Sequence, residues 1–173
     1  MKLDLSEIAR TVGMRATHDV DEPCFPEDTE LSCVSPIKGR LEIANTGSLV
    51  LVNGKIKADV RLTCSRCLTD LVIPVEAQVD EQFRLVQVGD AWMVMSEDED
   101  EAASDLVENN ILDVEELLRQ NLLVAIPIQP LCTRDCKGLC PTCGQNLNSG
   151  QCACPPEVVE SPFQALADLL KEE

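Results

Sequence analysis

The chain has 173 residues, a formal net charge of −17, ten cysteines and a single histidine. This length allows a buried core without covalent cross-links, and the acidic total excludes a protein that binds polyanions through its overall charge. No apolar run approaches the roughly 18 residues of a membrane span, and the first ten residues, MKLDLSEIAR, lack the apolar stretch of a signal peptide. We therefore expect a soluble protein that is not secreted.

The charge is distributed unevenly along the chain. Residues 34–67 contain six basic and two acidic residues, a local charge of +4, whereas residues 68–113 contain thirteen acidic residues and one arginine, a local charge of −12. We expect two surfaces of opposite charge. The densest acidic run falls within residues 96–111, which we interpret as a linker.

The first predicted elements are strands. Residues 1–36 are expected to pack on a sheet formed by residues 37–95, in which apolar and polar residues alternate at 55–62 and again at 71–79. The two alternating runs flank a short turn and therefore predict a β-hairpin with Cys64 and Cys67 at its tip. Further turns are predicted at Asn45-Thr46-Gly47 and Asn53-Gly54, and a further strand at 91–95.

Two helices are predicted downstream. The first spans residues 112–127, with Asp113 as N-cap, Glu116 as its capping-box partner and Pro127 at its end. The second lies within residues 157–173 and begins with Ser161 as N-cap. The predicted fold is α+β: an antiparallel sheet or partly open barrel, one or two packed helices, and a zinc-knuckle segment at residues 128–156.

Eight of the ten cysteines form four closely spaced pairs. Four thiolates from two such pairs are the usual ligands of a tetrahedral structural zinc ion, so eight cysteines predict two Zn²⁺ per chain. The short spacing between them favours the pairs Cys140/Cys143 and Cys152/Cys154 as the ligands of one local site. The remaining pairs, Cys64/Cys67 and Cys132/Cys136, then make a long-range site between the hairpin and the segment after the first helix. A local group of Cys132, Cys136, Cys140 and Cys143 is the alternative. The favoured partition is Cys64, Cys67, Cys132 and Cys136 for site 1, and Cys140, Cys143, Cys152 and Cys154 for site 2.

Other interpretations of these residues are weaker. A redox role for the Cys64/Cys67 pair would require a strand-to-helix context rather than a hairpin tip. Cys24 and Cys33 are expected to pack as small apolar side chains, and His18 to lie in a solvated loop. No Ser-His-Asp arrangement or phosphate-binding glycine loop is present, and all-cysteine sites are usually closed, so we expect no enzyme activity.

Several segments together resemble the YceD family, the large ribosomal RNA subunit accumulation proteins of bacteria and chloroplasts. They are GRLEI, NGKI, CSRCL, PLCTRDCKGLCPTCGQNLNSGQCAC and SPFQALADLL, which cover roughly residues 39–171 in order. The resemblance implies a small non-enzymatic protein needed for synthesis, processing or stability of 23S rRNA. It also implies a cytoplasmic protein in bacteria or, after removal of a transit peptide, one of the chloroplast stroma.

The expected partners are pre-ribosomal large-subunit RNA, basic ribosomal proteins, or both, with no membrane and no small-molecule substrate. The −12 segment favours cationic protein tails, and the shortage of aromatic residues argues against strong binding of naked RNA. Alternative functions are a zinc-ribbon adaptor of the transcription machinery and, less favoured, a thiol-based redox protein. The possible RNA contacts are Lys55, Lys57, Arg61, Arg66, Arg134 and Lys137.

Overall fold

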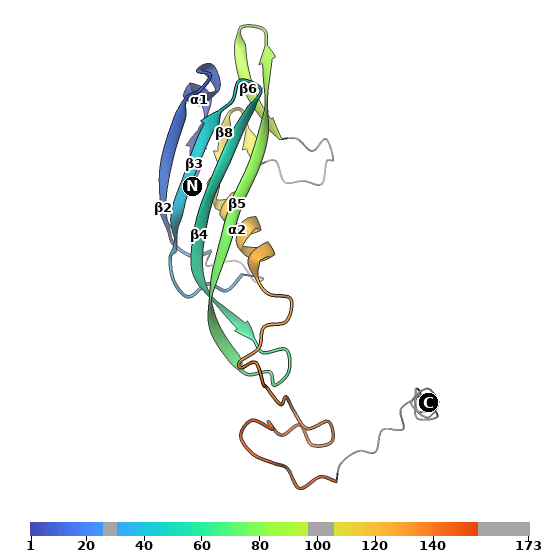
Figure 1. Cartoon of the computed structure of the whole chain (residues 1–173). Coiled ribbons are helices and arrows are strands. Elements are labelled where there is room, and N and C mark those ends of the chain that lie inside the picture. Colours follow the sequence, from blue (N-terminus) through green and yellow to red (C-terminus); the bar gives the residue numbers. More distant parts are fainter. Residues whose placement is uncertain (26–30, 97–105, 156–173) are drawn as a thin grey trace, which may run out of the picture.

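The computed structural model describes residues 1–25, 31–96 and 106–155 (Figure 1). Its main feature is a five-stranded antiparallel sheet in which each strand lies beside the strands that precede and follow it in the chain. The two longest strands, β4 and β5, run from the end of the sheet beside the β5–β6 turn to the hairpin tip, beyond which the cysteine-rich segment continues (Figure 1). In spatial order, the strands are β2 (Arg15–Glu22), β3 (Ile37–Asn45), β4 (Leu49–Thr63), β5 (Asp70–Val88) and β6 (Ala91–Ser96).

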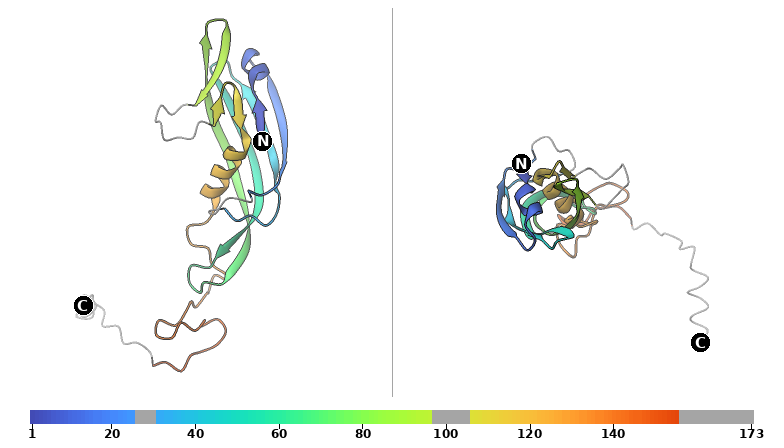
Figure 2. Two further views of the ribbon diagram at one scale, coloured as in Figure 1. Left: turned by 180° about the vertical axis from the view of Figure 1, so that it is seen from behind. Right: turned by 90° about the horizontal axis from the view of Figure 1, so that it is seen from above.

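A second layer covers one face of this sheet (Figure 2). It contains α1 (Ser6–Arg10), α2 (Val114–Ala125) and a three-stranded antiparallel sheet of β1 (Lys2–Asp4), β8 (Ile111–Asp113) and β7 (Val107–Glu108). The predicted α+β class is confirmed: the antiparallel sheet carries two helices, and its β2 and β6 edges do not pair to close a barrel. No helix among the described residues has the length and hydrophobicity needed to cross a membrane.

The core lies between the two layers. The alternation that predicted strands places one face of β4 and β5 inward, and α2 contributes three leucines that are fully buried. Each buried leucine, isoleucine, valine or phenylalanine contributes about 1.5–3 kcal/mol relative to an exposed one. The core residues of these three elements include Val50, Val52, Ile56, Val60, Val75, Val79, Phe83, Leu117, Leu118 and Leu122.

The turn predicted at Asn53-Gly54 is wrong. Both residues lie inside β4, opposite Glu42 and Leu41 of β3. A Cβ atom on Gly54 would lie 2.2 Å from the Arg40 carbonyl oxygen and 2.8 Å from Leu41 Cδ2. Glycine is present here because two strands and a large core side chain approach closely, rather than because the chain reverses. The turn predicted at 45–47 does occur, between β3 and β4.

Asn45 fixes that turn to the second layer. Its buried amide nitrogen donates hydrogen bonds to the carbonyl oxygens of Ile8 (2.7 Å) and Ala9 (3.2 Å) in α1, while its Oδ1 accepts from the Gly47 amide (2.7 Å). The side chain therefore binds two carbonyl groups at the end of α1, of which the Ile8 oxygen also accepts from the Thr11 amide at 3.2 Å. It is a buried polar group with its hydrogen bonds made.

Helix α2 begins where the capping pattern predicts. The Asp113 carboxylate accepts a hydrogen bond from the Glu116 amide at 3.3 Å. The reciprocal half of the capping box is replaced: the Asp113 amide donates to the Leu106 carbonyl oxygen, and the Glu116 carboxylate instead accepts from Gln120 Nε2 at 3.0 Å. The cap thus also connects α2 to the strand pair β7–β8.

The remaining predicted segments have mixed outcomes. Residues 107–108 and 111–113 form β7 and β8, so the chain becomes regular within the segment interpreted as a linker, whereas residues 97–105 lie outside the described part. The helix predicted within 157–173 lies outside the described residues as well. His18 is not in a loop: it is a residue of β2 paired with Leu41, and its Nε2 is buried without a hydrogen-bond partner in the described structure.

Candidate metal centres

The hairpin tip between β4 and β5 forms a compact knuckle. The Leu68 amide donates to the Cys64 carbonyl oxygen at 3.0 Å, and the Cys64 amide donates to the Thr69 carbonyl oxygen at 2.9 Å. These two bonds reverse the chain within six residues. They also aim both thiols of the pair to the same side, as a two-residue spacing between metal ligands requires.

The same knuckle recurs at residues 140–145. There the Gly144 amide donates to the Cys140 carbonyl oxygen at 2.9 Å, and the Cys140 amide donates to the Gln145 carbonyl oxygen at 2.8 Å. The residue after the second cysteine has positive φ in both copies, 56° at Leu68 and 72° at Gly144. Two segments with little sequence in common therefore adopt one local fold whose shared feature is the cysteine pair.

The first thiol tetrad, site 1, joins the hairpin tip to the segment after α2. It consists of Cys64, Cys67, Cys132 and Cys136, and all four Sγ atoms lie within 4.8 Å of one another. Two of the distances are 3.8 Å (Cys64 to Cys136) and 3.6 Å (Cys67 to Cys132). A tetrahedron with metal–sulfur bonds of about 2.3 Å has sulfur–sulfur edges of about 3.8 Å. The separations fit shared ligation and exceed the roughly 2.05 Å of a disulfide.

The second tetrad, site 2, is local. It consists of Cys140, Cys143, Cys152 and Cys154, whose Sγ atoms also lie within 4.8 Å of one another. Within the described part of the chain, the thiols group in this way rather than around the local alternative of residues 132–143. Cys24 and Cys33 belong to neither tetrad, and Cys33 packs against the core. The structure thus brings together the four thiols of each predicted site.

The electrostatics of the tetrads favour a cation. Amide hydrogen bonds, above all from Cys67, lower the pKa of Cys64 to about 6, and the Cys143 amide leads a similar set that lowers the pKa of Cys140 to about 6. In contrast, the thiol hydrogen bond to Cys136 raises the pKa of Cys132 to about 12, and that to Cys143 raises the pKa of Cys154 to about 12. In each tetrad, one thiol therefore ionises easily, and the ionisation of another is opposed by the thiols around it. A bound divalent cation would remove this opposition and favour the thiolate form of all four.

Hydrogen bonds outside the thiols hold site 1 together. Arg66 Nη1 donates to the Cys136 carbonyl oxygen at 2.9 Å, and the Ser65 amide donates to the Pro130 carbonyl oxygen at 2.9 Å. Gly138 lies against the hairpin tip, because a Cβ atom there would be 3.1 Å from the Arg66 carbonyl oxygen. Arg66, which the sequence predicted as an RNA contact, has its guanidinium bound to the backbone of the other half of the site.

Two asparagines complete the surroundings of site 1, and the sequence analysis missed both. Asn148 Nδ2 lies 3.3 Å from Cys136 Sγ, and Asn148 Oδ1 accepts from the Lys137 amide at 2.9 Å. Asn146 Nδ2 donates to Thr69 Oγ1 at 3.3 Å, and that hydroxyl lies 3.3 Å from Cys67 Sγ. Both asparagines lie between Cys143 and Cys152 of site 2, so their contacts with Cys136 and Thr69 connect the two tetrads. In the sequence they are the two asparagines of QNLNSG, a pattern that does not indicate which sulfur atom each one approaches.

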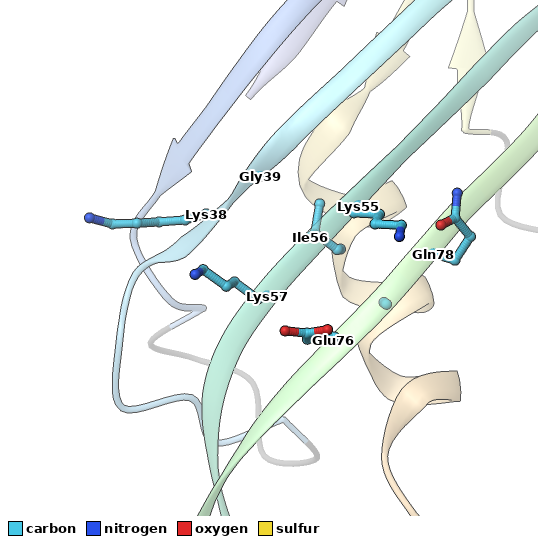
Figure 3. A pocket seen from close by; sticks show the side chains of 8 residues that line it. Lys38, Gly39, Lys55, Ile56, Lys57, Glu76 and Gln78 are labelled. Atoms are coloured by element: carbon cyan, nitrogen blue, oxygen red, sulfur yellow. The ribbon is translucent and has the colours of Figure 1, made fainter.

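The six predicted RNA contacts come from two parts of the molecule. Lys55 and Lys57 line a hollow in the middle of the main sheet (Figure 3). Arg61 lies four residues further along β4 than Lys57, which is about 13 Å at the rise of a strand. The other three, Arg66, Arg134 and Lys137, belong to the hairpin tip and the site 1 loop.

Comparison with known proteins gives one consistent result. The profile described as "Large ribosomal RNA subunit accumulation protein YceD" matches residues 52–170, a range that contains all eight cysteines of the tetrads. An uncharacterized protein of Mycobacterium tuberculosis is 28% identical, over 86% of this chain and 72% of the relative. YlbN of Bacillus subtilis is 27% identical, over 84% of this chain and 81% of its own length.

A plant protein is similar as well. The "Large ribosomal RNA subunit accumulation protein YCED homolog 1, chloroplastic" of Arabidopsis thaliana is 21% identical over 95% of this chain, which covers 55% of the plant protein. No solved structure matches the chain.

Proposed function

The chain belongs to the YceD family, and from this premise we propose that it is a non-enzymatic, zinc-stabilised factor supporting synthesis, processing or stability of 23S rRNA during assembly of the large ribosomal subunit. The observation that carries the proposal is the family match over residues 52–170. The names of the plant relatives, from Arabidopsis thaliana and Zea mays, support the same role. We place the protein in the bacterial cytoplasm or, for a chloroplast member, in the stroma.

The geometry supports a structural role for the metal. Each tetrad offers four sulfur ligands, which is the ligand set of closed zinc sites, whereas catalytic zinc sites leave one position for water. Three of the site 1 cysteines are buried, so access by a substrate is restricted. The chain's own residues position the thiols and the hairpin tip, and a bound Zn²⁺ would supply the cohesion between them.

The role of site 1 in this function is mechanical. It connects a hairpin of the main sheet to the cysteine-rich segment, so a bound metal would fix the orientation of that segment on the sheet. We propose large-subunit RNA or basic ribosomal proteins as the partners of the assembled surface. A redox role is disfavoured, because each close cysteine pair faces a second pair at the separation expected for shared ligands.

The test is genetic complementation in a bacterium depleted of its own family member. We expect the ratio of 23S to 16S rRNA to fall on depletion and to be restored by the wild-type chain but not by a Cys67→Ser/Cys132→Ser variant. Cys24→Ser, which lies outside both tetrads, is the matched control and should restore the ratio. An unchanged ratio on depletion, or co-sedimentation with RNA polymerase instead of large-subunit precursors, would contradict the proposal.

A further inference from the structure

The outer face of the main sheet, opposite the core, carries a cluster of cations on its two neighbouring strands β3 and β4. We call this cluster the basic face. Its side chains are exposed, and strand register places Lys38 directly opposite Lys57 and Arg40 directly opposite Lys55. The basic face consists of Lys38, Arg40, Lys55, Lys57 and Arg61.

The charges are unfavourable for the pairing of β3 with β4. Like charges directly opposite each other on neighbouring strands destabilise strand pairing, whereas opposite charges at the same positions stabilise it. The pairs Lys38–Lys57 and Arg40–Lys55 place two such repulsions side by side. Lys38, Arg40 and Lys57 also face an acidic residue on their other neighbouring strand, whereas Lys55 faces Gln78, so strand pairing offsets only part of this repulsion. The acidic residues are Asp21, Asp19 and Glu76.

Only part of the charge is neutralised within the protein. Arg40 Nε lies 2.7 Å from Asp19 Oδ1, and Lys38 Nζ lies 4.0 Å from Asp21 Oδ1, both on the β2 side. Among the described residues, Lys55, Lys57 and Arg61 make no ion pair. Lys55, Lys57 and Arg61 are separated by two and four residues along β4, so their side chains project from one face of the sheet. Asp59 projects from the same face between Lys57 and Arg61.

The basic face borders a hollow. Lys38, Lys55 and Lys57 line a cavity of about 420 Å³ together with Glu76 and Gln78 of β5 (Figure 3). An adjoining hollow of about 410 Å³ shares Lys38, Lys57 and Glu76 with it, so the depression continues across β3, β4 and β5. In Figure 3, Lys55 extends toward Gln78, whereas Lys57 and Lys38 extend in the other direction, toward β2.

Aromatic side chains are not available to this face. Phe83 is buried, and Phe25 and Trp92 pack against the core, so no described aromatic residue offers its ring on the outer face of β3 and β4 for stacking on a base. A partner recognised here would contact lysine and arginine side chains, which bind phosphate and carry no base preference by themselves.

We propose that the basic face is a phosphate-binding surface for the backbone of an RNA strand, recognised without regard to sequence. The inference rests on the proposed function, because it takes RNA rather than an acidic protein as the partner. It keeps Lys55, Lys57 and Arg61 from the RNA contacts predicted from the sequence and adds Lys38 and Arg40 of β3. The three predicted contacts near the metal sites, Arg66, Arg134 and Lys137, are not part of it. Glu76, which lines both hollows, and Asp59, which lines the second, limit the affinity by repelling the same phosphates.

The test measures binding of a fluorescein-labelled single-stranded RNA of mixed sequence to the zinc-loaded full chain by fluorescence anisotropy at several salt concentrations. Lys55→Thr/Lys57→Thr should weaken binding and reduce the slope of log affinity against log salt by about 1.4, since each phosphate contact on a single strand adds about 0.7. Glu76→Gln should strengthen binding. Arg84→Thr, which removes an exposed cation of β5 away from the hollow, should change neither quantity beyond experimental error.

A second readout separates a binding role from a structural one. Lys57 faces Lys38 on one side and Glu76 on the other, and Lys55 faces Arg40. The double variant removes two repulsions and one attraction, so it should unfold at about the temperature of the wild type or above it while it loses RNA affinity. A lower unfolding temperature together with unchanged RNA binding would overturn the proposal. Preferential binding of labelled polyglutamate that depends on the same lysines would also overturn it, because the partner would then be an acidic protein.

Complementation distinguishes failure of this inference from failure of the proposed function. If the wild-type chain restores 23S rRNA in depleted cells and the double lysine variant binds RNA as tightly as the wild type, the basic face is not the contact and the proposed function stands. If depletion does not alter 23S rRNA, the proposed function fails together with the inference built on it.

Discussion

Two regions of this molecule are held together by different interactions. The body, which comprises the two sheets and both described helices, encloses a continuous apolar core. The segment from 131 to 154 contains no helix and no strand of either sheet. The buried cluster that contains its Cys136 consists of three cysteines, with leucines packed around them. Apolar burial accounts for the body, whereas the segment depends on what its thiols bind.

The comparison shows how a metal can replace a core. An exposed loop of this length buries too little apolar surface to compensate the entropy of ordering it. A structural zinc ion bound by thiolates provides about 10–16 kcal/mol of apparent binding free energy in small peptides, which is enough to order such a segment. Site 1 also includes Cys64 and Cys67 of the body, so the metal would couple the two regions.

Metal removal should produce the largest difference between the regions. On treatment with a zinc chelator, we expect residues 131–154 to lose hydrogen-exchange protection while the amides of β3, β4 and α2 keep theirs, because the body has its own core. The measurement is hydrogen exchange with mass spectrometry before and after chelation. Simultaneous loss of protection in both regions would show that the body also depends on the metal.

A cavity in the core should have the converse effect. Leu118→Ala removes a fully buried side chain of α2 and should lower the free energy of unfolding of the body by about 2–5 kcal/mol without changing the metal content. Denaturant titration followed by circular dichroism measures the first quantity and elemental analysis the second. Val124→Ala, at an 88% exposed position of the same helix, is the control and should change stability little.

Crowding between the central strands should have a smaller effect. Gly54→Ala places a Cβ atom 2.2 Å from a backbone oxygen of β3, and the strands must separate to admit it. We expect a loss of about 1–3 kcal/mol, the usual range for overpacking. Thermal unfolding of the variant would measure it. A variant as stable as the wild type would mean that β3 and β4 are not held as closely as described.

The two knuckles offer the finest test. Leu68 adopts a left-handed conformation that costs a non-glycine residue about 1–2 kcal/mol, while the equivalent residue of the other knuckle is Gly144. Leu68→Gly should therefore raise the affinity of site 1 for zinc slightly, and Gly144→Ala should lower that of site 2. Competition with a chromophoric chelator measures both. Opposite signs would refute the equivalence of the knuckles.

Sequence reasoning succeeded where one residue pattern had one structural explanation. Period-two alternation predicted the β4–β5 hairpin, and Asp113 marked the start of α2, because both signals are local. The prediction at Asn53-Gly54 was wrong because the same dipeptide occurs in turns and where two strands approach closely. Only the pairing of Gly54 with Leu41 of β3 distinguishes the two cases. The sequence did not predict β2 as a strand, because its inward residues, Ala16, His18 and Val20, give only a weak alternation of apolar and polar residues.

The candidate site shows a similar division. Cysteine spacing predicted which thiols lie together, because short spacings restrict the geometry of a shared ligand site. Spacing could not reveal that Arg66 binds the Cys136 carbonyl, or that Asn148 lies against Cys136 Sγ, because these contacts depend on how the hairpin tip meets the loop. The basic face likewise requires the β3–β4 register, which pairs cations that are distant in sequence.

The most direct test of the two-region account is the amount of zinc and iron bound per untagged chain. We predict two zinc ions in the wild type, one in Cys67→Ser/Cys132→Ser and one in Cys143→Ser/Cys152→Ser, with the body folded in all three. A folded wild-type chain that contains neither metal, with residues 131–154 still protected from hydrogen exchange, would contradict the claim that thiolate-bound metal organises this segment.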